Sequence, residues 1–556
     1  MSKLSLFLTV LFCTCTLIVH SKVYYVAPAG NDSHAGTVDA PFLTIQRAHT
    51  DVAAGDTVYI RGGTYMMQES QIFEKTTGNP RYAYVSKLTK SGTSGKRINY
   101  WAFPGEKPIF DFSNVKPADH RIHAFEVTGS WMHFKGLEVV GVQVTIDQNI
   151  NTQSVCFSNN ANVVTNGSNN IYEQLVMRDG MAIGFYLTRG ANNLVLNCDA
   201  YNNWDTVSAD KKGGNVDGFG AHPNRVEYTG NVFRGCRAWF NSDDGFDIIS
   251  SHTAITVEDC WSFYNGYSIE FENLANGTGF KMGGFGTSSS PSVPAVIPRH
   301  TVRNSLAYNN KSSGFYANHH LGGNDWYNNT AYFNWPNFNM LNRSPNYTAS
   351  IPGYDHVMKN NVSYLTRSDR EHHLITEIDE REGVNILSHN TFMNPGIGTP
   401  TAADFISLDQ SQLTLPRKPN GDLPDVTFMV PAPGSKLVGA GIDVGLPFTG
   451  SSPDLGYRES QLVLSVKPAT VRASAAYLYP VPANKVLNIH FPDRASKPVT
   501  ISIFDLQGRK VSSTEIAATN ALAADVSRLP DGIYFLEASY SGTNVVFSRS
   551  KFLKRQ

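Results

Sequence analysis

Two short motifs recur along the middle of the chain, and this pair of repeats constrains the fold more than any other feature. The dipeptide Gly-Phe begins at positions 184, 218, 245, 279 and 314. A small residue followed by an aromatic residue, usually with asparagine close behind, begins at 200, 238, 262, 307, 331 and 363. The spacing within each series varies, which fits strands separated by loops better than stacked helix pairs. The sequence therefore predicts an all-β fold, a right-handed parallel β-helix whose coils lie about 4.8 Å apart.

Equivalent positions of successive coils form ladders in such a fold, and the repeats show which residues these are. A repeated large apolar residue is needed only at a buried position. We therefore expect an inward-pointing, stacked ladder of Phe185, Phe219, Phe246, Phe280 and Phe315. Recurrent asparagines should form amide ladders at the turns, at positions 202–203, 241, 265, 309–310 and 334.

Three of the four cysteines beyond residue 21 fall on one further ladder, namely Cys198, Cys236 and Cys260. The same position is continued in later coils by Ser305, Asn329 and Asn361. Buried free thiols are expected of such a ladder, and disulfides, usual in a secreted chain, are the alternative. None of the cysteines stands in a Cys-x-x-Cys pair, so zinc is not expected.

The ends of the chain differ from the repeat region. Residues 1–21 carry Lys3 before an apolar run, which is typical of a secretory signal peptide. A membrane anchor is the alternative, although the run is short for a span. Residues 22–456 form the predicted β-helix, with a helix at 44–52 expected to cap its first coil, and 457–477 form a linker. Residues 478–556 alternate like the strands of a small β-sandwich.

Composition excludes one class of partner. Charged residues make up 17% of the chain and the net charge is −1, so no basic field is present to hold nucleic acid. We expect a monomer.

The C-terminal segment carries Tyr-Pro-Val-Pro-Ala at 479–483, Phe-Asp-Leu-Gln-Gly-Arg at 504–509 and Leu-Pro-Asp-Gly-Ile-Tyr at 529–534. With these motifs, residues 478–556 resemble the C-terminal sorting domain of the Bacteroidetes type IX secretion system. The resemblance implies that the type IX machinery is a partner. It also implies that the protein is secreted or attached to the cell surface after export through the outer membrane. A carbohydrate-binding module is the alternative interpretation.

Four aspartates gather around two of the Gly-Phe pairs. Asp217 and Asp244 directly precede the glycines, Asp243 precedes Asp244, and Asp247 follows Phe246. Stacked coils would bring these carboxylates together, where they repel one another unless a cation is present. Calcium takes six to eight oxygen ligands from flexible carboxylate sites, so we predict a Ca²⁺ site here. The alternative is that Asp-Asp-Gly-Phe-Asp merely forms a turn, which aspartate favours.

Lys281 follows Phe280 as Asp247 follows Phe246, so the two side chains should be stacked neighbours on the outer surface. The lysine lies in Gly-Phe-Lys-Met-Gly-Gly-Phe-Gly at 279–286, where no long side chain shields it from an approaching polymer. A solvated surface charge is the alternative.

Three motifs in this order, Asn-Val-Asp-Gly-Phe at 215–219, Asp-Asp-Gly-Phe-Asp at 243–247 and Gly-Phe-Lys-Met-Gly-Gly at 279–284, resemble polysaccharide lyase family 9. This family comprises pectate-lyase and rhamnogalacturonan-lyase β-helices, and the resemblance covers roughly residues 23–456. It implies that Asp217, Asp243, Asp244 and Asp247 ligate calcium and that Lys281 is the catalytic base. The implied substrate is pectin, with polygalacturonate expected ahead of rhamnogalacturonan.

The residues suit this chemistry. Elimination across C4–C5 of a uronic acid removes the proton next to the carboxylate, and a cation must neutralise that carboxylate. The base must be unprotonated, whereas free lysine titrates near about 10.4. Nearby calcium would lower the lysine pKa and the aspartates would oppose that change. We expect a neutral-to-alkaline pH optimum.

Candidate substrate contacts are His222, Arg225, Tyr316, Asn318 and His319. For the histidines a structural role in turns is the alternative. A β-helix glycoside hydrolase, which uses two carboxyl groups and no metal, would leave Lys281 without a role. A non-catalytic glycan-binding or adhesive β-helix is the alternative from another class. The sequence leaves open the exact substrate, endo or exo action, and the number of further calcium sites.

Overall fold

The computed structural model describes residues 21–149, 151, 153–160, 166–285, 293–346, 348–367, 374–393, 397–460, 477–479, 483–490, 498–505, 509–517, 521–541 and 546–555. The chain divides into two compact units, Met1–Leu462 and Val463–Gln556. The expected signal peptide lies outside the described residues except for Ser21, and so does most of the expected linker, 461–476.

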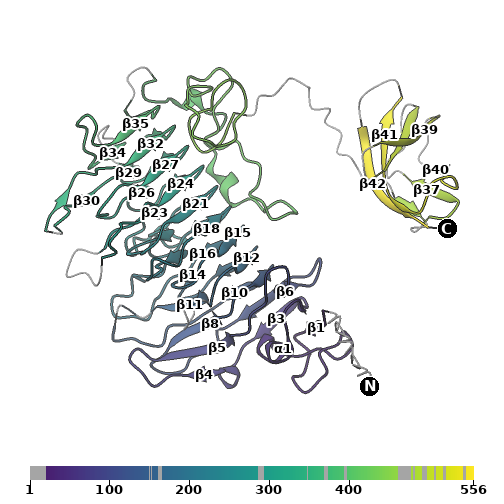
Figure 1. Ribbon diagram of the computed structural model, residues 1–556, viewed down its shortest axis with the longest axis horizontal. Coiled ribbons are helices and arrows are strands. Elements are labelled where there is room, and N and C mark those ends of the chain that lie inside the picture. Colours follow the sequence, from purple (N-terminus) through teal and green to yellow (C-terminus); the bar gives the residue numbers. More distant parts are fainter. Residues whose placement is uncertain are drawn as a thin grey trace, which may run out of the picture. The chain divides into compact units, whose positions relative to one another are not determined.

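Three sheets run along the first unit (Figure 1), and their strands in the described residues are as follows. Sheet A has twelve strands: β1 (Val23–Val26), β2 (Thr57–Ile60), β6 (Ile98–Ala102), β9 (Met132–Lys135), β12 (Ile171–Glu173), β15 (Leu194–Leu196), β18 (Asn231–Arg234), β21 (Ile255–Glu258), β24 (Thr301–Arg303), β27 (Asp325–Tyr327), β32 (Val357–Lys359) and β35 (Ile386–Ser388). Sheet B has ten: β3 (Gly63–Met66), β7 (Pro108–Asp111), β10 (Glu138–Val140), β13 (Val176–Arg178), β16 (Asp199–Tyr201), β19 (Arg237–Trp239), β22 (Trp261–Phe263), β25 (Leu306–Tyr308), β28 (Thr330–Tyr332) and β33 (Val362–Tyr364). Sheet C has eleven: β4 (Glu74–Lys75), β5 (Tyr82–Leu88), β8 (Arg121–Val127), β11 (Ser154–Asn159), β14 (Ala182–Leu187), β17 (Phe219–Ala221), β20 (Phe246–Asp247), β23 (Phe280–Lys281), β26 (Phe315–Tyr316), β29 (Phe338–Asn339) and β34 (Ile375–Thr376).

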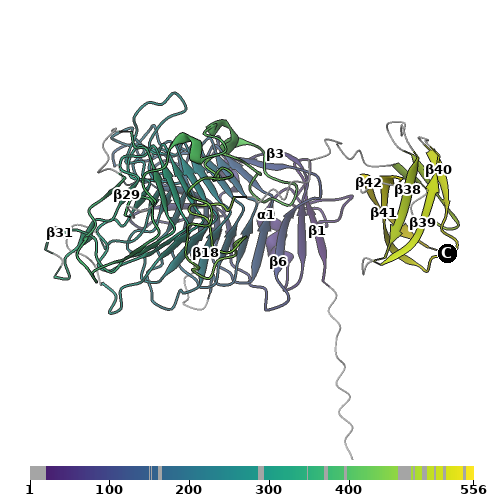
Figure 2. The same cartoon turned by 90° about the horizontal axis from the view of Figure 1, so that it is seen from above.

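The chain visits sheets A, B and C in turn, as in β6, β7 and β8, and each such circuit is one coil. Strands of successive coils pair in parallel, as β17 does with β20 and β20 with β23. Figure 2 shows these strands lying side by side along the unit. The predicted right-handed parallel β-helix is therefore confirmed.

The phenylalanine ladder is present in sheet C. Phe219 pairs with Phe246, Phe246 with Phe280, and Phe280 with Phe315. All four side chains are 0% exposed. Their ring centroids lie 5.0, 4.8 and 4.9 Å apart in successive coils, with interplanar angles of at most 15°. The prediction that these residues are buried and stacked is confirmed.

The glycine of each Gly-Phe pair is where the two sequence repeats meet. A Cβ atom at Gly218 would lie 2.8 Å from Ala238 Cβ, and one at Gly245 would lie 2.1 Å from Ser262 Oγ. A residue without a side chain is therefore needed opposite the small residue of sheet B, so that sheets B and C can approach. This contact explains why the two motifs advance together along the chain.

The asparagine and cysteine ladders are also present. Asn241 Nδ2 donates to Asn265 Oδ1, and the same 3.0 Å bond is repeated from Asn265 to Asn310 and from Asn310 to Asn334. The cysteines of the described chain are buried and free. Their ladder continues as expected, because the Cys260 N–H donates to Ser305 Oγ and the Ser305 N–H donates in the same way to Asn329 Oδ1 of the next coil.

A short helix, α1 (Ile45–Asp51), packs against β1, β2 and β5 at the first coil. Thr44 caps it by accepting a hydrogen bond from the Arg47 N–H. Ile45 and Ala48 are buried and belong to the main hydrophobic core, so the helix covers the apolar start of the stack as expected.

The coils end at β35, before the expected boundary at residue 456. Residues 389–456 belong to the same compact unit but add no further coil to the three sheets in their described part. They contain no Gly-Phe pair, and the small-aromatic motif at their start, Thr391-Phe392, is followed by no further strand of the three sheets in the described chain. Instead Leu413, Phe428 and Leu455 pack on Trp261 and Leu306 of sheet B. Their remaining elements are the 3-10 turns Ala402–Asp404 and Gln410–Thr414. Elsewhere lie the 3-10 turn Glu69–Gln71 and the antiparallel pair β30 (Asn342–Arg343) and β31 (Ser350–Ile351).

The second unit is a small antiparallel β-sandwich, as predicted. One sheet contains β36 (Tyr477–Tyr479), β37 (Val486–His490) and β40 (Ala521–Asp525), and the other contains β39 (Lys510–Ile516), β38 (Val499–Phe504), β41 (Gly532–Tyr540) and β42 (Val546–Lys554). Its own core includes Leu487, Ile501, Leu536 and Phe552. Across the described residues of both units, no helix has the length and apolar character needed to cross a membrane.

Candidate active site

The candidate residues lie on the outer face of sheet C, at strands β17, β20 and β23. The phenylalanine ladder points into the core, so the residue after each phenylalanine faces outward. The strand register places Gly220 beside Asp247, Asp247 beside Lys281, and Lys281 beside Tyr316. Asp247 and Lys281 are thus stacked neighbours, as the repeat predicted.

Lys281 bridges two carboxylates. Its Nζ donates to Asp244 Oδ2 at 3.0 Å and to Asp247 Oδ2 at 3.2 Å. The lysine side chain is 15% exposed, whereas the Asp244 side chain is fully buried. A regular strand would send Asp244 and Asp247 to opposite faces. Strand β20 begins only at Phe246, and the irregular backbone at Gly245 lets both carboxylates reach the same amine.

Asp217, Asp243 and Asp244 form a compact carboxylate group. Each offers one oxygen such that the three oxygens lie within 4.8 Å of one another, and all three residues are buried. Backbone N–H groups hold them in place: Asn215 donates to Asp243 at 2.6 Å and Thr278 donates to Asp244 at 2.7 Å. Three converging carboxylates of this kind suit a hard cation with oxygen ligands, such as calcium.

Asp247, the fourth predicted ligand, does not belong to this compact group. One of its oxygens accepts from the Ile249 N–H at 2.9 Å and the other accepts from Lys281. It therefore lies at the edge of the group, linked to Asp244 through the lysine amine that both contact.

Burial and mutual repulsion shift the protonation of this cluster. Burial, with the charges of Asp247, Asp243 and Asp244, raises the pKa of Asp217 well above its usual range. Burial and the neighbouring Asp244 raise the pKa of Asp243 to about 7. Burial also raises the pKa of Asp244, against the effect of Lys281. A buried cluster of this kind holds its full negative charge at neutral pH only if a cation compensates it.

The pKa shifts of the two remaining groups favour their charged forms, since the pKa of Asp247 falls and that of Lys281 rises. Burial alone would raise the pKa of Asp247, but Lys281 and His222 outweigh it and lower that pKa below its ordinary value. Burial lowers the pKa of Lys281, but the four aspartates, Asp244 first, raise it well above its ordinary value. Without a metal ion, Lys281 is therefore held protonated as the counter-ion of the carboxylates.

We expect the metal-free protein to lose stability through Asp243 as the pH rises from about 4 to about 7. An unfolded aspartate ionises near pH 3.8, whereas folded Asp243 does so near 7. A carboxyl whose pKa is raised by folding destabilises the fold as the pH passes from the unfolded to the folded value. Thermal unfolding of the wild type and Asp243→Asn, with chelator, should show the variant gaining relative stability across this interval. Calcium should reverse the order, and an unchanged difference with calcium would contradict a metal site here.

His222 borders the site on the side of the preceding coil. Its Nε2 lies 3.7 Å from Asp247 Oδ1, and its Nδ1 lies 2.9 Å from Tyr186 Oη. Tyr186 follows Phe185 and so occupies the same outward column as Asp247 and Lys281. Burial, then Asp247 and Asp217, raise the pKa of its hydroxyl. Reasoning from the sequence did not select Tyr186, although its place in that column was the available signal.

Three predicted substrate contacts lie one coil beyond Lys281. Tyr316 is its register neighbour, and Tyr316 Oη lies 3.1 Å from His319 Nδ1. Asn318 and His319 adopt the left-handed conformation, with φ of 52° and 56°, and Asn318 Nδ2 donates to the Gly283 carbonyl at 2.9 Å. Arg225 lies exposed in the loop between β17 and β18 and, in the described chain, makes no ion pair with the aspartates.

Together these residues present one amine beside a charged carboxylate cluster on an outward-facing sheet. Such an arrangement can hold a cation and remove a proton from a ligand bound across both. It offers an oxygen-rich site for the metal and a nitrogen base within about one coil spacing of it.

Two families match the chain. Residues 24–361 match the family described as Pel9A-like, right handed beta helix region. Residues 477–551 match the secretion system C-terminal sorting domain. The first match contains every aspartate discussed above and Lys281, and the second covers the strands of the β-sandwich up to residue 551 of β42.

Relatives of known activity resemble the chain over most of their length. Pectate lyase L of Dickeya dadantii is 32% identical over 444 residues, which cover 78% of this chain and 90% of that protein. Pectate lyase PEL9 of Emericella nidulans is 29% identical over 436 residues, covering 74% of this chain and 93% of that protein.

Two solved structures also resemble it. A rhamnogalacturonan lyase superimposes with a TM-score of 0.69 at 49% sequence identity, covering 73% of this chain and 96% of that one. The pectate lyase Pel9A superimposes with a TM-score of 0.60 at 30% identity, covering 79% of this chain and 96% of that one.

Proposed function

The chain belongs to the Pel9A-like family of right-handed β-helix proteins, and from this membership we propose that it cleaves a pectic polysaccharide by β-elimination, with Lys281 as base and calcium held by the neighbouring aspartates. It is a polysaccharide lyase, because its relatives are pectate lyases and a rhamnogalacturonan lyase across 90% or more of their length. The observation that carries the mechanism is the contact of one lysine amine with two aspartates beside a buried carboxylate group.

The enzyme works outside the cytoplasm. Its C-terminal sorting domain marks it for export, so it is secreted or displayed at the cell surface. We propose that residues 478–556 are read by the type IX machinery, that 457–477 is a linker, and that 22–456 carries the lyase activity. We also propose that residues 1–21 are the signal peptide and that the enzyme acts as a monomer.

Calcium fits the carboxylate group formed by Asp217, Asp243 and Asp244, and we propose that Asp247 completes the set from its edge. Support comes from the burial of these residues and from the raised pKa values of the first three. A calcium ion bound there would neutralise the carboxylates and the uronate carboxylate of the substrate, which makes the adjacent C5 proton easier to remove.

Calcium bound at this site would also change the protonation of Lys281. While Asp244 and Asp247 are uncompensated they hold the amine protonated. Once their charge is neutralised, burial of the amine favours its neutral form. Neutral Lys281 takes the C5 proton, the C5–H electron pair forms the C4–C5 double bond, and the C4–O glycosidic bond breaks with its electron pair going to the departing oxygen, which takes up a proton from water. Tyr316 and His222 flank the amine and its aspartate partner, and we propose that they, with Asn318 and His319, contact the sugar.

For the substrate we place rhamnogalacturonan ahead of polygalacturonate. The reason is that sequence identity to the rhamnogalacturonan lyase is 49%, against 30% to the pectate lyase of known structure. This reverses the order expected from sequence motifs, which are shared by both kinds of enzyme. Polygalacturonate stays the second candidate because of the 32% identity to pectate lyase L.

The test is the initial rate of formation of the unsaturated product, followed by its ultraviolet absorbance, on both polymers over a calcium series. We expect a rate on rhamnogalacturonan at least about tenfold higher, which corresponds to about 1.4 kcal/mol of transition-state preference. Chelator should abolish it. A higher rate on polygalacturonate would overturn the substrate assignment, and full activity in chelator would overturn the role of calcium.

A further inference from the structure

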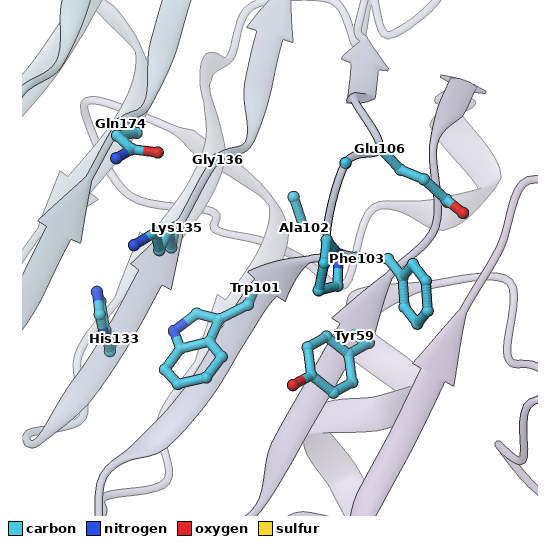
Figure 3. A pocket seen from close by; sticks show the side chains of 11 residues that line it. Tyr59, Trp101, Ala102, Phe103, Glu106, His133, Lys135, Gly136 and Gln174 are labelled. Atoms are coloured by element: carbon cyan, nitrogen blue, oxygen red, sulfur yellow. The ribbon is translucent and has the colours of Figure 1, made fainter. Parts of the chain in front are cut away.

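A pocket lies on sheet A, away from the carboxylates of sheet C. It has a volume of about 530 Å³ and is formed by β2, β6 and β9 at the start of the β-helix. This size lies within the range of pockets that hold small ligands. Figure 3 shows its side chains: the rings of Tyr59, Trp101 and Phe103 lie near one another, with His133 and Lys135 on the adjacent strand. We call it the sheet A pocket.

The strand register builds an aromatic row along this pocket. Tyr25 pairs with Tyr59, Tyr59 with Trp101, and Trp101 with Lys135 in successive coils, all on the outer face. The ring centroids of Tyr25 and Tyr59 lie 6.0 Å apart, and those of Tyr59 and Trp101 lie 6.4 Å apart. All three rings are half-buried, so part of each remains open to solvent. Further along the same column the residues are ion-paired instead, as in Arg234, Glu258 and Arg303.

The charges around the pocket cancel. Lys135 Nζ lies 2.7 Å from Glu173 Oε1, and His133 Nε2 lies 2.8 Å from the other oxygen of the same carboxylate. Arg61 pairs in the same way with Glu106, at 2.7 Å. The pocket thus differs from the site on sheet C, where carboxylates outnumber the lysine. It offers hydrogen-bonding groups at its rim but no uncompensated cation.

We propose that the sheet A pocket is a non-catalytic binding site for a neutral sugar residue of a polysaccharide. The C–H face of a pyranose ring is apolar with a slightly positive edge, and it stacks on the negative face of an aromatic ring. Trp101 and Tyr59 supply that surface, and His133, Lys135 and Gln174 line the pocket beside them. His133 and Lys135 bond to Glu173, and Gln174 Nε2 donates to the Asn420 carbonyl at 2.8 Å, so a sugar hydroxyl would share these groups with their present partners. A uronate would bring a carboxylate for which the pocket has no free cation. The proposal concerns a different sheet from the lyase site and is independent of that site's substrate.

The experiment is affinity electrophoresis of the full chain in gels containing a neutral galactan. The wild type should be retarded relative to a gel without polymer, and Trp101→Ala should lower the affinity about tenfold, as truncation of a central aromatic contact does. Tyr59→Ala is the second variant and should also reduce retardation. Phe535→Ala, which removes a 45% exposed ring in the C-terminal unit, is the matched control and should behave as wild type.

Thermal unfolding of each variant separates loss of binding from loss of fold, and Trp101→Phe, which keeps an aromatic surface, should restore most of the retardation. Wild type that migrates freely in galactan, or Trp101→Ala that is retarded equally, would overturn the proposal. A parallel gel with polygalacturonate uses Lys281→Ala to limit cleavage. Retardation there that depends on Trp101, without retardation in galactan, would show an acidic-sugar site and also overturn it.

Discussion

Lys281→Ala is expected to lower the initial rate of elimination by about 10²–10⁴-fold, the usual effect of removing a general base. The amine contacts both Asp244 and Asp247, and alanine leaves no proton acceptor at its position. No calcium concentration should restore the rate. Calcium affinity should not fall, because the substitution removes a cation that competes for the same carboxylates. The measurements are the rate on rhamnogalacturonan over a calcium series and calcium binding by calorimetry.

Lys87→Ala is the matched control for this prediction. Lys87 belongs to the same outward column of sheet C, is 16% exposed, and pairs with Glu74 far from the aspartates. Its loss should leave the rate near that of the wild type. Lys281→Arg keeps a cation beside Asp244 but should remain inactive, since a guanidinium stays protonated. If Lys281→Ala keeps more than about a tenth of the wild-type rate, the base is another residue.

Asp244→Ala is expected to give the second large effect, and one of a different kind. Asp244 is the residue shared by the carboxylate group and the lysine contact. Loss of an outer-shell partner of a metal typically lowers metal affinity about 10–100-fold. Removal of Asp244 should therefore raise the calcium concentration needed for half-maximal activity by at least about that factor. Part of the lost rate should return at high calcium, because Asp217, Asp243 and Lys281 remain. A rate that recovers with calcium for Asp244→Ala but not for Lys281→Ala separates the metal site from the base.

Asp325→Ala is the control for loss of a carboxylate. Asp325 lies on sheet A, is partly buried and pairs with Arg299. Its removal should leave the calcium dependence unchanged. An unchanged half-maximal calcium concentration in Asp244→Ala would show that the carboxylate group is not the metal site, whatever the variant does to the rate.

Much of the fold could be predicted from the sequence because a β-helix repeats its contacts. Each coil makes the same contacts with the next coil, so residues at equivalent positions share the same surroundings. For this reason Phe246 and Phe280 are buried together, and Asn241 bonds to Asn265. The same logic placed Asp247 beside Lys281, since strand register carries outward residues into line as well as inward ones. Prediction stopped where repetition stopped. Residues 389–456 carry no Gly-Phe pair, and their packing on sheet B rests on scattered apolar residues such as Leu413 and Phe428.

The features of the candidate site also divide into those that the repeat predicts and those that depend on the tertiary structure. The sequence alone determined which coils hold the aspartates and the lysine, because identical motif positions must stack. Only the tertiary structure decided that Asp217, Asp243 and Asp244 converge while Asp247 stays at their edge. That arrangement depends on the bend of the backbone at Gly245, just before β20, and on N–H groups from other coils. The aromatic row of the sheet A pocket likewise could be recognised only in the tertiary structure. Tyr25, Tyr59 and Trp101 come from coils joined by loops of unequal length, and only strand pairing brings their outward faces into one column.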